Sequence, residues 1–424
     1  MPFNDKPEYF CASMRQLIIN IGQLVNVRES TKLLRGKSLS ELEVLTGAYV
    51  IVEDKKIAAY GLMTDLVEEL SQNTIDAQGA TILPCWCDSH THLVFAATRE
   101  DEFVDKLKGK TYAEIAANGG GILNSARKLA ASTEEELFAS SWQRLQQLMK
   151  LGTGAIEIKS GYGLDTENEL KMLRVIQRLK QEAPIPVKAT FLGAHAVPVL
   201  YKDDKESYIR LLINEMLPRI AKENLADYID VFCEHGFYTQ EETERICNAG
   251  KQYGLLPKIH ANQLSLSGGV QAGVHVNAVS VDHLEVMDEE TTQSLAQSAT
   301  IGTLLPTAAF FLRAPFQPAR KLIDAGCAIA LASDYNPGSS PSGNMNFVVS
   351  LSCIQMKMLP EEAINAATIN GAFAMQVADE CGSITVGKRA NLIFMKSIPS
   401  LAYIPYSFGN NLIDKVMING RFLE

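Results

Sequence analysis

Eight short apolar segments between residues 80 and 335 constrain the fold of this chain more than any other feature of its sequence. They are rich in Ile, Val, Leu and Ala, and polar residues do not alternate with the apolar ones. A strand with one face in water would show that alternation, so these segments are expected to be covered on both faces, as in a parallel sheet. The segments span residues 80–90, 153–161, 186–195, 228–236, 257–263, 277–285, 300–306 and 327–334.

Helical patterns fill the intervals between these segments. Three capping boxes, in which a glutamate follows a threonine by three positions, predict helix starts at Thr133, Thr166 and Thr239. Strands that alternate with helices form a parallel sheet, and eight repeats favour closure into a (β/α)₈ barrel. An open doubly wound sheet is the alternative, but no G-x-G-x-x-G sequence follows the first segment, which argues against a dinucleotide-binding half.

The two ends of the chain show a different pattern. Short β-type segments occur within residues 17–78, and similar segments return at 391–394 and 415–418. Two β-rich ends that bracket a barrel suggest a small sheet domain to which both termini contribute. We therefore predict an α/β fold with two domains: a TIM-like (β/α)₈ barrel formed by residues 80–382, and a small β-sandwich formed by residues 1–79 together with 383–424.

The composition limits the partners and the compartment. The 424 residues carry 39 Lys and Arg against 49 Asp and Glu, a formal net charge of −10, and no basic run, which argues against nucleic acid or an anionic membrane surface as a partner. No stretch of about 18 apolar residues is present, and no basic segment followed by an apolar run opens the chain, so neither a membrane span nor a secretory signal is expected. The eight cysteines show no repeating spacing, which fits reduced thiols in the cytoplasm.

Polar residues gather at the carboxyl ends of the predicted strands. Six of the seven histidines follow such an end, and His275 is the exception. In a barrel these ends converge on one mouth, where active sites are built, so the mouth is expected to carry the chemistry. The strand-end residues are Asp88, His90, His92, His195, Glu234, His235, His260, His283 and Asp334.

Four of these residues have the chemistry of a metal site. His90 and His92 are separated by one residue on an extended segment, so both imidazoles face the same side, as two ligands of one metal must. This spacing alone also arises in ordinary strands. His260 and Asp334 each follow an apolar segment directly and complete a set of three nitrogen ligands and one oxygen ligand suited to Zn²⁺ or Fe²⁺. Such a site would activate a water molecule.

Further residues near the strand ends are candidates for catalysis and binding. His283 is a candidate base, although a buried histidine bonded to a carbonyl is the alternative. Arg99 suits the capture of a substrate carboxylate, while pairing with a neighbouring acidic side chain is the common case. Tyr162 lies between two glycines in a loop that either presents its phenol to a ligand or packs it. Asn336 belongs to a turn that either binds a polar group or is an ordinary Asn-Pro-Gly turn.

Seven motifs taken together resemble the amidohydrolase superfamily and, within it, the imidazolonepropionase family. The resemblance covers nearly the whole chain. The Asp-x-His-Thr-His pattern at 88–92 marks only the superfamily, whereas SGYGL (160–164), FLGAHAVP (191–198) and SDYNPGS (333–339) are more specific. SGYGL belongs to a longer motif at 157–164. The other motifs on which the resemblance rests are 84–103, 110–122, KIHANQL (258–264) and VDHLE (281–285).

The resemblance implies a fold, a reaction and a role for each site residue. The fold of the family is a distorted (β/α)₈ barrel with a β-sandwich built from both chain ends. The implied reaction is the metal-dependent hydrolysis of 4-imidazolone-5-propanoate to N-formimidoyl-L-glutamate in histidine degradation. Arg99 would bind the propionate carboxylate, and His283 and Asp334 would move protons. The implied metal ligands are His90, His92, His260 and Asp334, and the implied contacts with the ring, the product and the rest of the pocket come from Tyr162, His195, Gln263, Asn336, Gly338 and Ser339.

At two positions the sequence departs from the patterns of related enzymes, which limits the roles that the resemblance implies there. Gln263 stands where some family members have Glu, so a general-base role at that position is not assumed here. The fourth predicted strand ends in Cys233-Glu234-His235, without the lysine that bridges two metals after carbamylation in other members of the superfamily. One metal ion per chain is therefore predicted, although Glu234 could bridge two in principle.

Two other functions remain as alternatives. A related amidohydrolase or deaminase that acts on another nitrogen heterocycle uses the same ligand set, but a neutral nucleobase gives no reason for a carboxylate clamp at Arg99. A catalytically silent binding protein would be expected to lose ligands, and all four are present. The prediction is a cytoplasmic hydrolase of a small cyclic amide, with a homodimer as the expected assembly.

Overall fold

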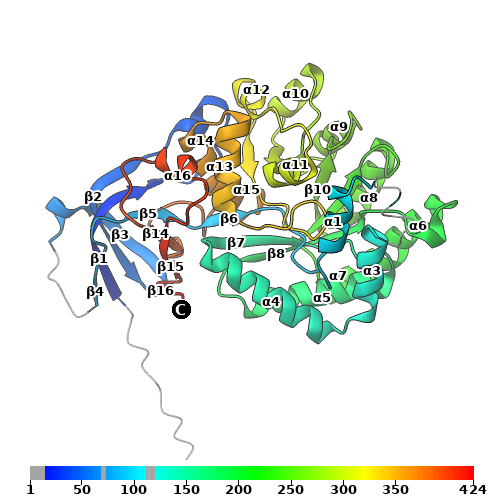
Figure 1. The fold of residues 1–424 in the computed structure, drawn as a ribbon, viewed down its shortest axis with the longest axis horizontal. Helices are drawn as coiled ribbons and strands as arrows, with labels where there is room; N and C mark the ends of the chain where they lie inside the picture. Colours follow the sequence, from blue (N-terminus) through cyan, green and yellow to red (C-terminus); the bar gives the residue numbers. More distant parts are fainter. Residues whose placement is uncertain (1–14, 68–72, 111–113, 115–119) are drawn as a thin grey trace, which may run out of the picture.

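The computed structural model of the chain describes residues 15–67, 73–110, 114 and 120–424. The first residues, on which the prediction about a secretory signal rests, lie outside the described residues, as does most of the motif at 110–122. Figure 1 shows a barrel surrounded by helices and, beside it, a smaller sheet in which blue N-terminal strands lie next to orange and red C-terminal ones.

The barrel contains eight strands, and all of its neighbouring strands are parallel. Strands that follow one another in the chain are neighbours in the sheet, and nearly all of their residues are buried. Both features confirm the predicted (β/α)₈ barrel. The strands are β6 (Trp86–Asp88), β7 (Thr153–Lys159), β8 (Val187–Ala194), β9 (Tyr228–Cys233), β10 (Leu256–Ala261), β11 (Ser280–His283), β12 (Ile301–Leu304) and β13 (Ile329–Leu331).

The first and last barrel strands meet just beyond their carboxyl ends. The backbone N–H and the hydroxyl of Ser333 both donate to the Asp88 carboxylate, at 2.9 and 2.6 Å. The N–H of Asp334 donates to the carbonyl of His90 at 3.0 Å, and the N–H of His92 donates to the carbonyl of the residue after Asp334 at 2.9 Å. These bonds set the segment that carries the two histidines against the segment that carries Asp334.

The segment at 80–90, predicted as one barrel strand, is divided between two sheets. β5 (Thr81–Pro84) pairs with β1 (Arg15–Val25) and β14 (Leu392–Met395), whereas β6 pairs with β7. The chain crosses from one sheet to the other at Cys85. The apolar run gives no sign of this division, because both of its halves are buried and extended.

Both chain ends contribute to the second sheet, which confirms the predicted domain built from the two termini. Its strand order is β16-β15-β14-β5-β1-β2-β3, and β4 pairs with β1. One apolar cluster joins residues of the N-terminal strands, such as Leu24 and Ile82, to residues of the C-terminal strands, such as Leu392. The remaining strands are β2 (Val44–Glu53), β3 (Lys56–Leu62), β4 (Thr74–Asp76), β15 (Ile413–Ile418) and β16 (Arg421–Phe422).

The helices surround the barrel, with a further group between the barrel and the terminal sheet (Figure 1). Within the described residues no helix is both long enough and apolar enough to cross a bilayer. The helices are α1 (Glu100–Leu107), α3 (Ile122–Ala131), α4 (Glu134–Lys150), α5 (Thr166–Glu182), α6 (Lys205–Leu211), α7 (Leu217–Glu223), α8 (Gln240–Lys251), α9 (Gly269–His275), α10 (Glu289–Ala296), α11 (Pro306–Leu312), α12 (Ala319–Asp324), α13 (Met345–Met356), α14 (Pro360–Ala367), α15 (Ile369–Ala374) and α16 (Tyr403–Tyr406).

Two of the three predicted capping boxes are present. Those of Thr133 and Thr239 cap α4 and α8. The box predicted at Thr166 is wrong, because the residue before it, Asp165, caps α5 by accepting a backbone N–H of the first turn. Glu169, the expected partner of Thr166, instead accepts hydrogen bonds from the loop that follows β7. Because Asp165 caps the helix, the Glu169 carboxylate can bond to the loop after β7 instead of to its own helix.

Candidate metal centre and active site

His90, His92 and Asp334 lie together where the barrel closes. Nε2 of His90 and Nε2 of His92 are each 3.5 Å from Oδ1 of Asp334, and all three side chains are buried. The backbone of Asp334 has a φ of +52°, a conformation that non-glycine residues rarely adopt outside functional or turn positions. The hydrogen bonds that join the first and last strands thus bring two predicted ligands to a third.

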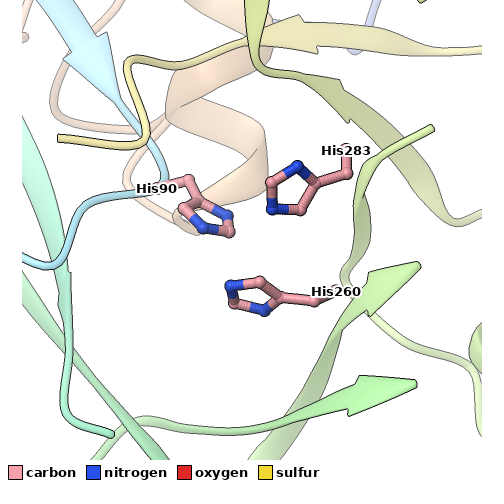
Figure 2. A group of neighbouring side chains, drawn as sticks. All are labelled: His90, His260 and His283. Carbon is pink, nitrogen blue, oxygen red and sulfur yellow. The ribbon is translucent and has the colours of Figure 1, made fainter. Parts of the chain in front are cut away.

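His260 and His283 extend this cluster from β10 and β11. The ring centroid of His260 is 4.5 Å from that of His90 and 5.3 Å from that of His283. Figure 2 shows the three rings pointing into the space between them. The ligand atoms form two overlapping groups within 4.8 Å, one of His90, His92 and Asp334 and one of His90, His260 and His283. The predicted ligand set draws members from both groups.

The nitrogen atoms of this cluster fit a metal. Nε2 of His90 and both ring nitrogens of His260 are buried and make no hydrogen bond of good geometry among the described residues. The same holds for Nδ1 of His92, whose Nε2 is the atom that faces Asp334. Burial lowers the pKa of both His90 and His92 well below the ordinary value, which keeps these imidazoles neutral and able to bind a cation. Buried, unpaired nitrogens are costly unless a ligand satisfies them. Three imidazoles and one carboxylate form a donor set suited to a first-row divalent ion.

Two buried aspartates orient the histidines. Oδ2 of Asp282 lies 2.7 Å from Nδ1 of His90, and Oδ2 of Asp230 lies 3.0 Å from Nδ1 of His260. A carboxylate on Nδ1 fixes the ring and leaves Nε2 for the metal. The sequence analysis assigned neither aspartate a role. The signal that marks them is an acidic residue inside a strand whose residues are all buried, in β9 and in β11.

Asp334 and His283 have shifted acidities. Burial raises the pKa of the Asp334 carboxyl to about 6. Burial opposes the charge on His283, but the neighbouring carboxylates, first among them Glu285, outweigh it and raise the pKa of this imidazole. Nδ1 of His283 is 3.5 Å from Glu285, which also accepts a hydrogen bond of 2.9 Å from Gln317. Both groups are therefore suited to hold and release a proton near neutral pH.

The loop after β7 places Tyr162 at the site. The backbone N–H groups of Gly161, Gly163 and Leu164 donate to the Glu169 carboxylate, at 3.1, 2.6 and 3.2 Å respectively. Tyr162 is buried, and burial raises the pKa of its phenol, so the hydroxyl stays protonated. Glu169 thus anchors the predicted binding loop, a function that its place in a capping-box pattern concealed.

His195, at the end of β8, lies between this loop and the metal ligands. Its ring stacks on that of His92, with centroids 5.3 Å apart and an interplanar angle of 16°. Its Nδ1 lies 3.1 Å from the carbonyl of Gly161. Burial lowers the pKa of His195 to about 3, so its imidazole is neutral near neutral pH.

Arg99 lies on the far side of Tyr162. Its guanidinium carbon is 5.9 Å from the centre of the Tyr162 ring, and its Nε donates to the hydroxyl of Ser125 at 2.9 Å. A Cβ at Gly338 would come within 2.5 Å of a guanidinium nitrogen, so a larger residue there would displace the end of the Arg99 side chain. A second cation, Lys106, reaches the carbonyl of Gly338 at 3.5 Å and was missed by the sequence analysis.

Gln263 and Asn336 are also predicted binding residues, and their side chains differ in how far neighbouring groups engage them. Gln263 is half-buried just after β10, and Glu234 accepts the N–H of the next residue at 2.9 Å. The amide of Asn336 is engaged within its own turn, where its oxygen accepts the N–H groups of Gly338 and Ser339, both at 2.8 Å. Asn336 therefore shapes the turn, and a direct contact between its side chain and a ligand stays a prediction.

Comparison with known proteins supports one family. Residues 81–423 match the model of the amidohydrolase family. Imidazolonepropionase from Christiangramia forsetii is 53% identical and that from Flavobacterium johnsoniae 54% identical, each over 97% of this chain and the whole of the relative. Imidazolonepropionase from a Geobacillus species is 42% identical over 96% of this chain and 98% of its own.

Solved structures with a similar fold are more distant in sequence. The 5-methylcytosine deaminase from Klebsiella pneumoniae superposes with a TM-score of 0.74 at 17% identity, covering 96% of this chain and 97% of that chain. Guanine deaminase from E. coli gives 0.72 at 13% identity, covering 97% and 99%. At these identities the likeness concerns the fold.

Proposed function

The chain belongs to the amidohydrolase family and, within it, to the imidazolonepropionases, and on this premise we propose that its histidine-rich site opens the ring of 4-imidazolone-5-propanoate. Water adds to the ring carbonyl, the carbonyl–nitrogen bond breaks, and the departing nitrogen takes a proton, which gives N-formimidoyl-L-glutamate. The observation that carries the proposal is the row of contacts from Arg99 through Tyr162 to His92, which sets a cation beside the metal centre.

We propose one divalent ion per chain, Zn or Fe, held by His90, His92, His260 and Asp334. The support is the set of buried, unpaired ring nitrogens and the two aspartates that orient His90 and His260. When bound, such an ion acts as a Lewis acid and lowers the pKa of water toward neutrality.

Two residues of the chain are proposed to move the protons. Asp334 and His283 have raised pKa values and come from neighbouring parts of the mouth. One accepts the proton that the attacking water releases, and the other returns a proton to the departing ring nitrogen. Gln263 carries no ionisable group, so this assignment gives it a binding role and no part in the proton transfer.

The binding roles follow from the chemistry of each side chain. Arg99 offers two parallel N–H donors to the propionate carboxylate, and Lys106 adds a second positive charge nearby. Neutral His195 and the phenol of Tyr162 face the imidazolone ring, which Gln263 also contacts. Gly338 gives the carboxylate arm space beside the guanidinium. Asn336 and Ser339 line the remaining wall through their turn.

The organisation of the protein is proposed from the sequence. We propose a homodimer in the cytoplasm as the assembly. That neither nucleic acid nor a membrane is a partner is proposed from the net charge of −10 and the absence of a basic run from the sequence. The domain limits are likewise proposed: residues 80–382 for the barrel and both flanks for the sandwich, with the first limit moved to Cys85 because β5 pairs within the terminal sheet.

One experiment tests the function. Purified protein is analysed for metal, and the loss of imidazolonepropionate is followed by absorbance while ammonia release is measured in parallel. We expect loss of substrate without ammonia, together with about one metal ion per chain. Release of ammonia from a neutral heterocycle, with no turnover of imidazolonepropionate, would replace the proposal with the deaminase alternative.

A further inference from the structure

One buried lysine contacts both aspartates that orient the histidines of the proposed metal centre. Lys159 ends β7 and is fully buried. Its ammonium is 2.8 Å from Oδ2 of Asp230, 3.6 Å from Oδ2 of Asp282 and 2.6 Å from Oε1 of Glu157. Neither the sequence motifs nor the proposed reaction gives this residue a task.

The oxygen atoms involved are the ones that face the histidines. Oδ2 of Asp230 contacts both Lys159 and Nδ1 of His260, and Oδ2 of Asp282 contacts both Lys159 and Nδ1 of His90. One ammonium therefore connects two ligand–carboxylate pairs that come from different strands. Moving or removing it would affect both pairs at once.

We propose that Lys159 is a positioning residue of the metal centre: by bridging Asp230 and Asp282 it holds both carboxylates at Nδ1 of His260 and His90, so that both Nε2 atoms face the metal. This inference rests on the metal site of the proposed function. It concerns how the site is assembled, since Lys159 itself contacts no proposed ligand.

The electrostatics explain why a cation is needed at this point. Two carboxylates buried in one region repel each other, and without a cation between them they would move apart. A carboxylate that has moved away no longer accepts the N–H of its imidazole, so the ring loses its fixed tautomer and orientation.

The chain provides a matched control in Lys258. This lysine is equally buried and lies in β10, two residues before His260. Among the described residues its ammonium contacts the carboxylate of Glu157 and the carbonyls of Ser89 and Ala374, the latter two at 3.0 and 3.3 Å. It therefore shares the burial and one partner of Lys159 but has no contact with either orienting aspartate.

The test compares Lys159→Met with Lys258→Met in the full-length protein. Zn²⁺ is titrated against a chromophoric chelator, and unfolding is measured in parallel. Loss of a group that orients metal ligands typically weakens metal binding by 10–100-fold, so we expect a rise of that size in Kd for Lys159→Met. Lys258→Met is expected to lose stability and keep the wild-type Kd.

The opposite results would overturn the inference. A neighbouring cation that merely repelled the metal would give Lys159→Met tighter binding, and a purely structural lysine would leave the Kd of the folded variant unchanged. If Lys159→Met does not fold, Lys159→Gln replaces it, because the amide keeps a donor while removing the charge, and the same rise in Kd is expected.

A second measurement uses the metal-free wild type. Nitrogen-15 spectra of labelled histidines are expected to show His90 and His260 as Nδ1–H tautomers, with the Nδ1–H signals lost in Lys159→Met and retained in Lys258→Met. Nε2–H tautomers in the wild type would contradict the proposed arrangement. Failure of the wild type to bind Zn²⁺ would instead count against the proposed function, so the two failures are distinguishable.

Discussion

The two sheets of this protein bury different kinds of side chain. The cluster inside the terminal sheet contains apolar residues such as Ile18, Leu24 and Ile82. The barrel interior also buries charged groups beneath its mouth, namely Glu157, Lys159, Asp230, Lys258 and Asp282. Apolar burial stabilises a fold directly, whereas buried ion pairs gain little over apolar replacements because desolvation offsets their attraction.

This difference separates stability from chemistry within one chain. The terminal sheet joins both ends of the chain and contributes no proposed site residue. The barrel mouth contains the proposed metal ligands, the orienting aspartates and Lys159. Apolar residues at these positions would avoid the free-energy cost of desolvating buried charges. Substitutions in the two regions should therefore have different consequences, and each of the following experiments tests that expectation.

The largest effect is expected for His260→Ala at the barrel mouth. A bound metal stabilises the transition state by several kcal/mol, so its loss should reduce kcat/KM by roughly 10³-fold or more. The variant should also lose its metal, measured by elemental analysis, and keep a largely intact fold. His275→Ala is the matched control, since His275 is exposed at the end of α9. Metal retained by His260→Ala would contradict its role as a ligand, and two tightly bound ions per wild-type chain would contradict the mononuclear site.

The next effect is expected for His283→Ala. If His283 carries a proton in the reaction, kcat should fall by roughly 10²–10⁴-fold while the metal content stays at the wild-type value. Steady-state kinetics at saturating substrate, with metal analysis of the same sample, measure both. A near-normal kcat would leave proton transfer to Asp334, and a loss of metal would place His283 among the ligands, in the group that it forms with His90 and His260.

A substitution in the terminal sheet should show the reverse behaviour. Ile82→Ala removes buried methyl groups from the apolar cluster and should lower the free energy of unfolding by about 2–5 kcal/mol, measured by chemical denaturation. The Kd for Zn²⁺ should not change. Val67→Ala is the control with little expected effect, because Val67 is 94% exposed. A weakened metal site in Ile82→Ala would show that the two sheets are coupled.

The smallest effect is expected at the rim of the mouth. Arg99→Ala should raise KM and reduce kcat/KM by an amount equivalent to about 1.5–3 kcal/mol, the range for one charge-assisted contact. Arg99→Lys should recover part of that loss, because an ammonium does not reproduce the two parallel hydrogen bonds of a guanidinium.

An analogue of the substrate without its carboxylate is the control for Arg99. The wild type should turn it over poorly, and Arg99→Ala should be no worse. A wild-type preference for the neutral analogue would rule out the carboxylate clamp and favour the deaminase alternative.

The sequence by itself determined the barrel, the terminal sheet and the positions that carry polar chemistry. The apolar runs without alternation can be satisfied only by strands covered on both faces, and the residues that follow them must lie at one mouth. His90, His92, His260 and Asp334 could be located in this way because a strand end is a local property. Their roles as ligands came from spacing and resemblance and stay predictions.

Only the tertiary structure decided which residues support that site. The division of the 80–90 run at Cys85 depends on which strands pair with each half, and the task of Glu169 depends on a loop that folds back onto α5. Lys159 reaches Asp230 and Asp282 across strands whose residues are 71 and 123 positions away in the chain. No local sequence pattern predicts such a contact, because a charge can be buried only where the fold brings partners to it from distant parts of the chain.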